Sequence, residues 1–268
     1  MATQQSAEGV LSGNVMFYQQ PEPLDPNTHG NLGVNMTDRP FGFAAKSHVV
    51  PLTVTEFAAA SLSYPIVFVG ESKSPLAVMG LRDGENLYIT EEGVFRPDVY
   101  IPAFIRRYPF VFAADDSNER FVLCVDRSAS FVSENPEIPF FENGQPSQYT
   151  QNAMQFCNDF ETERRRTDAF VKLLTDLDLF EVKEASFTPP NPDGSPGVKQ
   201  KLADYFGVSE AKLRNLPADK FIELRDNGAL NQIYSHLNSL LAWDKLIAHA
   251  MERRIAEVKS QAAVAANA

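Results

Sequence analysis

The chain has 268 residues, of which 44% are hydrophobic and 22% are charged, and its formal net charge is −11. This length is enough to bury a sizeable core, and the composition is typical of globular proteins. The acidic balance argues against a nucleic-acid partner and against attraction to an anionic membrane surface. No apolar run reaches about 18 residues, so we expect no membrane insertion. The first residues lack the basic and apolar regions of an export signal, which favours a cytoplasmic location.

Residues 15–150 predict an α+β region with an internal duplication. Two stretches are nearly the same, YPIVFVG at 64–70 and YPFVFAA at 108–114. Each follows a segment with helical spacing, and each precedes a polar turn and a second apolar run. A proline pushes the residue before it out of the α region, so each Tyr-Pro pair predicts the end of a helix and the start of a strand.

We therefore expect two helix–strand–strand repeats, at about 50–90 and 95–130. The continuous apolar runs suggest strands that are covered on both faces. The simplest arrangement is one antiparallel sheet with a helix from each repeat against it, and a groove at the seam between the repeats. The alternative is that the two stretches are alike by chance.

Residues 151–186 predict a helical segment packed on this sheet, because apolar residues recur there at helical intervals. The stretch FTPPNPDGSPG at 187–197 predicts a linker, either a loop or a domain hinge, because its prolines and glycines disfavour helix and central strand.

Residues 198–262 predict an α-helical C-terminal region that ends in one long amphipathic helix beginning near Ala229. A helix of roughly 30 residues spans about 45 Å, which exceeds the radius of a small domain. This length favours a homodimer in which part of the helix packs on a second subunit.

The common nucleotide, dinucleotide and hydrolase motifs are missing from the sequence. No histidine forms a metal-spaced pair with another histidine or a cysteine, so we expect neither a metal nor a cofactor. His236 lies in an apolar context, where it is either a hydrogen-bonded core residue or a catalytic base.

Arg106 and Arg107 come directly before Tyr108-Pro109, where the first repeat has Leu62 and Ser63. Cations at the end of a helix are favoured by the helix dipole. The alternative is that an arginine fork binds a carboxylate or a phosphate.

Two acidic residues lie at the ends of predicted elements. Asp126 ends the apolar run FVLCVD, where it either caps a turn or shares a site with one of the two arginines. Glu56 begins the helix of the first repeat, where the helix dipole favours an acid.

Several of these stretches together resemble the SapC family. The resemblance covers roughly residues 15–255 and depends on the stretches VVPLTVTEFAAASLSYPIVF, AVMGLRDGENLYI, YIPAFIRRYPFVFA, VLCVD and GALNQIYSHLNSL. The family takes its name from an association with the export of a bacterial surface layer. Its members are often encoded beside TonB-dependent receptors, flavin-dependent halogenase-like proteins and cupin-like proteins.

The resemblance implies no established catalytic residues, so its motif positions are only candidates for a binding site. They are Glu56, Tyr64, Arg106, Arg107, Tyr108, Asp126, Tyr234 and His236.

Three functions follow from these observations. The first is a non-catalytic cytoplasmic accessory protein of a nutrient-uptake locus, which binds a small anionic or peptide-like ligand or a partner enzyme. The second is an enzyme at the repeat seam, in which Arg106 or Arg107 holds an anionic substrate and Asp126 or His236 acts as base. The third is a component associated with surface-layer export.

Overall fold

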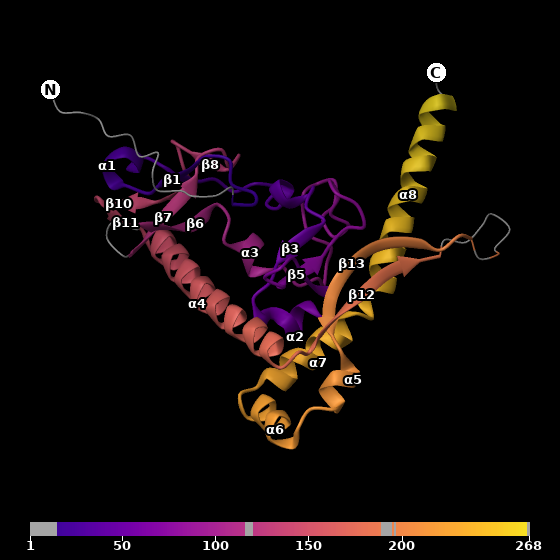
Figure 1. Ribbon diagram of the computed structural model, residues 1–268. Helices are drawn as coiled ribbons and strands as arrows, with labels where there is room; N and C mark the ends of the chain where they lie inside the picture. Colours follow the sequence, from indigo (N-terminus) through magenta and orange to yellow (C-terminus); the bar gives the residue numbers. More distant parts are fainter. Residues whose placement is uncertain (1–14, 116–119, 189–194, 196, 267–268) are drawn as a thin grey trace.

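The computed structural model describes residues 15–115, 120–188, 195 and 197–266. It confirms the α+β class, with several antiparallel sheets and helices packed around them (Figure 1). The long C-terminal helix is also present.

The largest sheet has five antiparallel strands in the order β12-β13-β4-β5-β3. Their bounds are β3 (Val49–Pro51), β4 (Ile66–Val69), β5 (Ser74–Val78), β12 (Phe180–Phe187) and β13 (Gln200–Val208). Strands β13 and β4 pair at one position, Phe206 with Phe68. The β12–β13 hairpin therefore diverges from the body, and Figure 1 shows it as a projecting arm.

Three smaller sheets lie at the other end of the molecule (Figure 1). The first has the order β1 (Pro21–Pro23), β7 (Arg120–Asp126), β6 (Phe110–Asp115). The second has the order β8 (Val132–Ser133), β2 (Gly33–Val34), β9 (Ile138–Pro139). The third pairs β10 (Phe141–Glu142) with β11 (Gln145–Pro146).

Both predicted repeats contain a short helix followed by two paired strands. The first has α2 (Phe57–Ala60) before β4 and β5, and the second has α3 (Ala103–Arg106) before β6 and β7. The expectation of one shared sheet is wrong, because the two hairpins belong to different sheets. Their remote partners differ, since β5 also pairs with β3 whereas β7 also pairs with β1.

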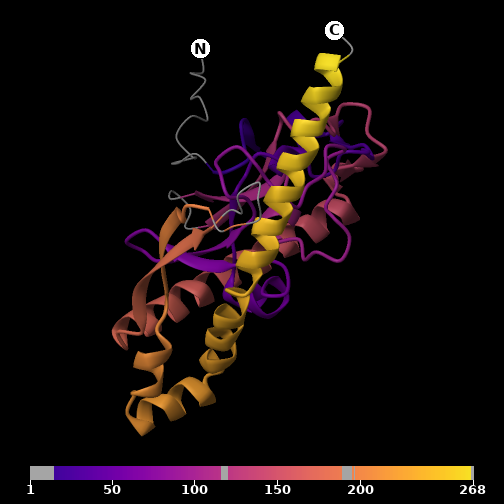
Figure 2. The same cartoon turned by 90° about the vertical axis from the view of Figure 1, so that its right-hand side faces the viewer.

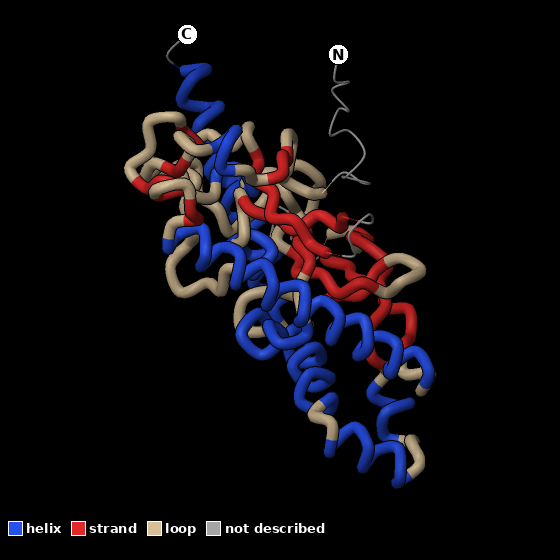
Figure 3. The backbone as a smooth tube through the Cα atoms, turned by 90° about the vertical axis from the view of Figure 1, so that its left-hand side faces the viewer, coloured by secondary structure: helices blue, strands red, loops and turns tan. Residues whose placement is uncertain are grey.

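Helix α4 (Gln148–Asp176) connects the two ends of the molecule (Figure 3). It begins after Ser147, whose hydroxyl oxygen accepts a hydrogen bond from the Thr150 N–H group. The helix holds η2 (Val54–Glu56) through the Thr167 hydroxyl oxygen, which accepts from the Val54 N–H group at 2.8 Å. Its charged residues pair on the exposed side. Two further short helical turns lie near the N-terminus, α1 (Pro26–His29) and η1 (Gly42–Ala44).

Two stretches that the sequence predicts as helical are strands. The helix after residue 151 ends at Asp176, and residues 180–187 form β12, while residues 200–208 form β13. The two strands pair along their length, so the predicted linker at 187–197 joins the strands of one hairpin. Residues 189–194 and 196 of that linker lie outside the described part of the chain.

The C-terminal region consists of α5 (Glu210–Arg214), α6 (Ala218–Asp226), α7 (Ala229–Ser239) and α8 (Ala242–Ala266). The predicted long helix is divided near Leu240 and Leu241, where backbone bonds to Leu237 and Asn238 make a turn. Helix α8 then runs along the molecule and projects past the sheets (Figure 2).

Candidate functional site

Glu56 is a structural carboxylate that ties the first repeat to the second. It is buried, and one oxygen accepts from the Thr53 N–H and hydroxyl groups, both at 2.8 Å. The other oxygen accepts from the Tyr100 hydroxyl group at 3.0 Å and from the Ala103 N–H group at 2.6 Å. The bond from the Thr53 N–H group is part of a capping box at η2, and the bond from the Ala103 N–H group fixes the start of α3.

Arg106 lies at the exposed end of this network. Its Nε donates to the Ile101 carbonyl group at 2.9 Å, and an Nη group donates to the Tyr100 hydroxyl group at 3.3 Å. The guanidinium also lies 5.2 Å from the ring of Phe156 on α4. Arg106 is thus linked to Glu56 through Tyr100.

Arg107, the next residue, is buried in an apolar environment. Its guanidinium carbon lies 4.2 Å from the ring of Phe104 and 4.5 Å from the ring of Phe160. Its Nε is fully buried and has no hydrogen-bond partner within the described ranges. Neighbouring residues of a helix face directions about 100° apart, so one arginine reaches solvent and the other the core.

Asp126 is completely buried at the end of β7 and is surrounded by donors. Its carboxylate accepts from the N–H groups of Gln19 and Gln20, from the N–H and hydroxyl groups of Ser128, and from the Tyr108 hydroxyl group at 3.1 Å. Burial alone would raise the pKa of Asp126, but the bonds from Ser128, Gln20 and Gln19 bring it below its usual value. Burial and the Asp126 charge raise the pKa of Tyr108. Asp126 therefore stays ionised and Tyr108 stays protonated.

Tyr64 is also a core residue. It is completely buried, and its hydroxyl group donates to the Tyr100 carbonyl group. Burial, with the nearby Tyr88, raises its pKa.

His236 of α7 joins two strands of the largest sheet. Its Nδ1 donates to the Ile66 carbonyl group of β4 at 2.9 Å, and its Nε2 accepts from the Val208 N–H group of β13 at 3.1 Å. The Ile66 N–H group donates to the Ser239 hydroxyl oxygen, also on α7. Burial lowers the pKa of His236 to about 4, so the imidazole is neutral near pH 7. Both ring nitrogens are occupied by the backbone.

The structure does not assemble the predicted site at the repeat seam. It brings Arg106 together with Glu56, and Tyr108 together with Asp126. Neither arginine forms an ion pair with Asp126 in the part of the chain that the structure describes. His236, on α7, is bonded to strands of the other sheet. No described cluster of His, Cys, Asp or Glu could hold a metal ion.

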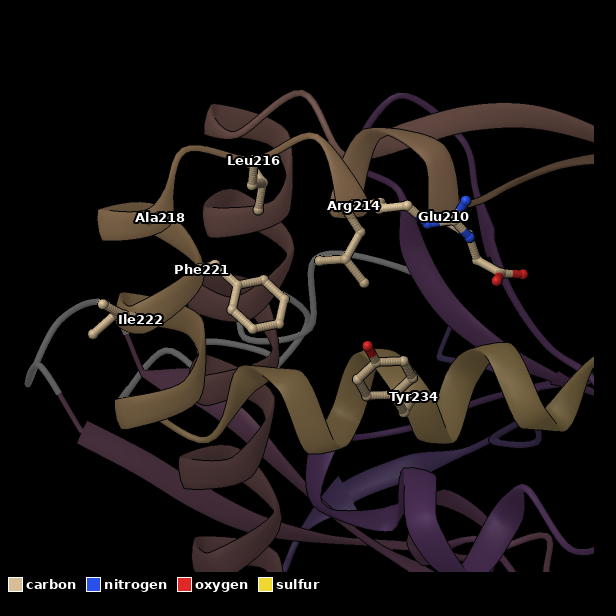
Figure 4. A pocket seen from close by; sticks show the side chains of 8 residues that line it. Glu210, Arg214, Leu216, Ala218, Phe221, Ile222 and Tyr234 are labelled. Carbon is tan, nitrogen blue, oxygen red and sulfur yellow. The ribbon is translucent and has the colours of Figure 1, made fainter.

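Tyr234 is the candidate that lines an open depression. The groove lies between α5, α6 and α7 and has a volume of about 520 Å³ (Figure 4). Its lining is mostly apolar, from Leu213, Leu216, Phe221, Ile222 and Tyr234. The exposed fractions of Phe221, Ile222 and Tyr234 are 37%, 45% and 48%, so these side chains are available to a ligand.

Two charged residues of α5, Glu210 and Arg214, flank the groove (Figure 4). Nearby cations are paired, Lys212 with Asp178 and Lys220 with Glu223. Arg214 has no ion-pair or hydrogen-bond partner for its side chain among the described residues. Arg214 and Phe221 are not among the candidate residues that the sequence indicates. The sequence shows apolar residues at helical spacing in these short helices. That spacing does not indicate which apolar helix face stays exposed in the fold.

The model of the family described as SapC matches the chain over residues 24–246. This match spans most of the chain. The chain belongs to the SapC family. A comparison with curated proteins and a comparison with solved structures found no match. The part that matches SapC includes every candidate residue, contains α7, and ends within α8. No helix within the described ranges is both long and apolar enough to cross a membrane.

Proposed function

We propose that this SapC protein is a non-catalytic accessory protein of a bacterial nutrient-uptake locus, which acts in the cytoplasm and binds a peptide segment of a partner protein. The observation that carries the proposal is the open apolar groove around Tyr234, at whose rim Arg214 has no side-chain partner among the residues that the structure describes. Binding sites for peptides are commonly apolar grooves between helices with a few polar groups at the edge.

The state of the titratable candidates supports a non-catalytic role. A general base must reach the proton that it abstracts. Glu56 and Asp126 are buried and each accepts several hydrogen bonds, while His236 has both nitrogens bonded to the backbone. Each of these groups has a structural role that accounts for its position.

The groove favours a segment with apolar side chains and an acidic one. Phe221, Ile222 and Tyr234 offer apolar and aromatic surface, which is where binding energy concentrates at interfaces. Arg214 would pair with a carboxylate of the bound segment, because an exposed guanidinium binds carboxylates in a bidentate fork. The family association makes a halogenase-like or a cupin-like protein the first partner to test.

The test is a calorimetric titration of the full chain with each of these two purified proteins. We expect Tyr234→Ala and Arg214→Glu to weaken binding at least about tenfold, as for residues central to an interface. Lys245→Glu is the matched control, because it makes the same charge change at an exposed position of α8 outside the groove. The proposal fails if neither protein binds, or if the groove variants bind as tightly as the control.

We also propose a second copy of the chain as a partner for α8. Residues 254–259 are all exposed, and Ile255 and Val258 lie on the same face as Met251. Glu252 and Lys259 flank this apolar stripe at equivalent heptad positions. In an antiparallel pair of α8 helices, Glu252 of one copy would oppose Lys259 of the other, and the same ion pair would form twice.

A further inference from the structure

Arg107 is a buried cation that has no ion-pair partner in the described part of the chain. Its side chain is 7% exposed, and neither an ion pair nor a side-chain hydrogen bond joins it to another described residue. Arg106 beside it uses its donors on Ile101 and Tyr100. Buried charged groups in proteins are normally paired, because an uncompensated charge is costly away from water. The unpaired guanidinium therefore needs an explanation.

Aromatic rings account for part of its environment. The guanidinium carbon lies 4.2 Å from the Phe104 ring, 4.5 Å from the Phe160 ring and 5.9 Å from the Tyr18 ring. These rings attract the cation through their electron-rich faces. They cannot accept two parallel N–H bonds as an oxyanion does, so the hydrogen-bonding capacity of the guanidinium is left over.

The terminal nitrogens are the atoms that a ligand can reach. The Nε is the one nitrogen of Arg107 that is both fully buried and without a partner. The two Nη groups have no hydrogen-bond partner among the described residues and are not fully buried, so the small remaining exposure of the side chain includes them. The Nη groups thus present donors toward solvent from a guanidinium whose other neighbours are aromatic.

We propose that the Nη groups of Arg107 bind the carboxylate of a small monocarboxylic acid. A planar carboxylate matches the fork of a guanidinium and carries the single negative charge that balances it. The charge of Glu161 acts on Cys157, and the charge of Asp126 acts on Tyr18. The charge of Arg107 acts on both Cys157 and Tyr18, so the two acids lie in its surroundings. The nearby acids would repel a second negative charge, which favours a carboxylate over a phosphate dianion. The aromatic rings suit the apolar part of an organic acid.

This site is independent of the groove around Tyr234. Arg107 follows α3, and Phe160 belongs to α4, whereas the groove lies between α5, α6 and α7 (Figure 1). Loss of one binding activity would therefore leave the other measurable.

The first test follows the Nε–H signals of arginine by NMR in the full chain during titration with sodium acetate, with sodium chloride keeping the ionic strength constant. The Arg107 signal is assigned by its absence from the Arg107→Lys variant. We expect a saturable shift of this signal with acetate and none with inorganic phosphate, while the Arg106 signal stays in place. An Arg107 signal that acetate does not move, or that phosphate saturates equally well, overturns the proposal.

The second test measures acetate binding through the thermal unfolding midpoint, again against chloride at equal ionic strength. Acetate should raise the midpoint of the wild type and of Arg106→Gln along the same saturation curve. Arg107→Lys keeps the charge but loses the fork, so we expect acetate to bind at least tenfold more weakly. If Arg107→Lys binds acetate as tightly as the wild type does, the guanidinium fork of Arg107 does not bind the carboxylate. If Arg107→Lys does not fold, the signal is assigned from the backbone and the NMR titration of the unaltered chain decides.

Discussion

The imidazole Nδ1 of His236 donates a hydrogen bond to the carbonyl oxygen of Ile66, 170 residues earlier in the chain, at 2.9 Å. The Nε2 of the same ring accepts from Val208, so one side chain bridges two strands that barely pair with each other. His236, a candidate base in the sequence, therefore holds two strands of the sheet together from α7.

His236→Leu should lower the free energy of unfolding by about 2–5 kcal/mol, because it leaves the buried Val208 N–H and Ile66 carbonyl groups without partners. Chemical denaturation with urea measures the change. Asn231→Ala, at an exposed position of the same helix, is the control and should change stability by less than about 0.5 kcal/mol. A loss no larger than that of the control would show that the bridge contributes nothing.

Acidification should destabilise the protein through His236. Burial lowers the pKa of this imidazole from 6.5 to about 4, and the nearby Lys183 acts in the same direction. The unfolded chain therefore binds a proton between these values while the folded chain does not. The contribution is complete above pH 6.5 and is lost as the pH falls toward 4, by about 3 kcal/mol in all. Unfolding free energies between pH 7 and 4 should show this slope, and the His236→Leu variant should lack it.

Asp126→Asn should cost about 1–3 kcal/mol of unfolding free energy, because an amide replaces an acceptor by a donor among groups that all donate. Ser128→Ala removes one of those donors and leaves the carboxylate, so its cost should be smaller, about 1 kcal/mol. The hydrogen bonds lower the pKa of Asp126, so its contribution is present at neutral pH and is lost as the pH falls below about 4. An asparagine variant as stable as the wild type would contradict the role assigned to the five bonds.

The double variant Ile255→Glu, Val258→Glu should convert the proposed dimer into a monomer, because four carboxylates would meet in one apolar seam. Sedimentation velocity gives the oligomeric state. Ala256→Glu, which faces away from that stripe, should leave the dimer intact. If the wild-type protein sediments as a monomer at micromolar concentration, the proposal that α8 binds a second copy of the chain is wrong.

The sequence predicts best where the cause is local. Pro65 and Pro109 each follow a short helix and precede a strand, as the preference of the residue before proline requires. The charged residues of α4 also follow a local helical period, and they pair with one another on the exposed side.

The sequence predicts the wrong element where pairing with a remote strand decides the structure. Leu202 and Phe206 fit a helical spacing, but residues 200–208 pair with β12 and meet β4 at Phe68. Such strand pairing overrides a weak local preference. For the same reason, the similar hairpins β4–β5 and β6–β7 belong to different sheets, because β5 also pairs with β3 and β7 also pairs with β1.

The candidate site shows the same limit. The sequence indicates the motif positions, but it does not show that the neighbours Arg106 and Arg107 have opposite environments, one exposed and one buried. Exposure of Phe221 and Tyr234 depends on how α6 and α7 pack, which is a tertiary property.

The bridge made by His236 also sets an order of events during synthesis. Ile66 leaves the ribosome 170 residues before His236 does. At a typical rate of translation this interval is about 10–30 s. Until then, the N–H and carbonyl groups of Ile66 lack their hydrogen-bond partners on α7. This part of the β4 edge is therefore unpaired in the nascent chain. A chaperone that shields strand edges would have its longest opportunity here.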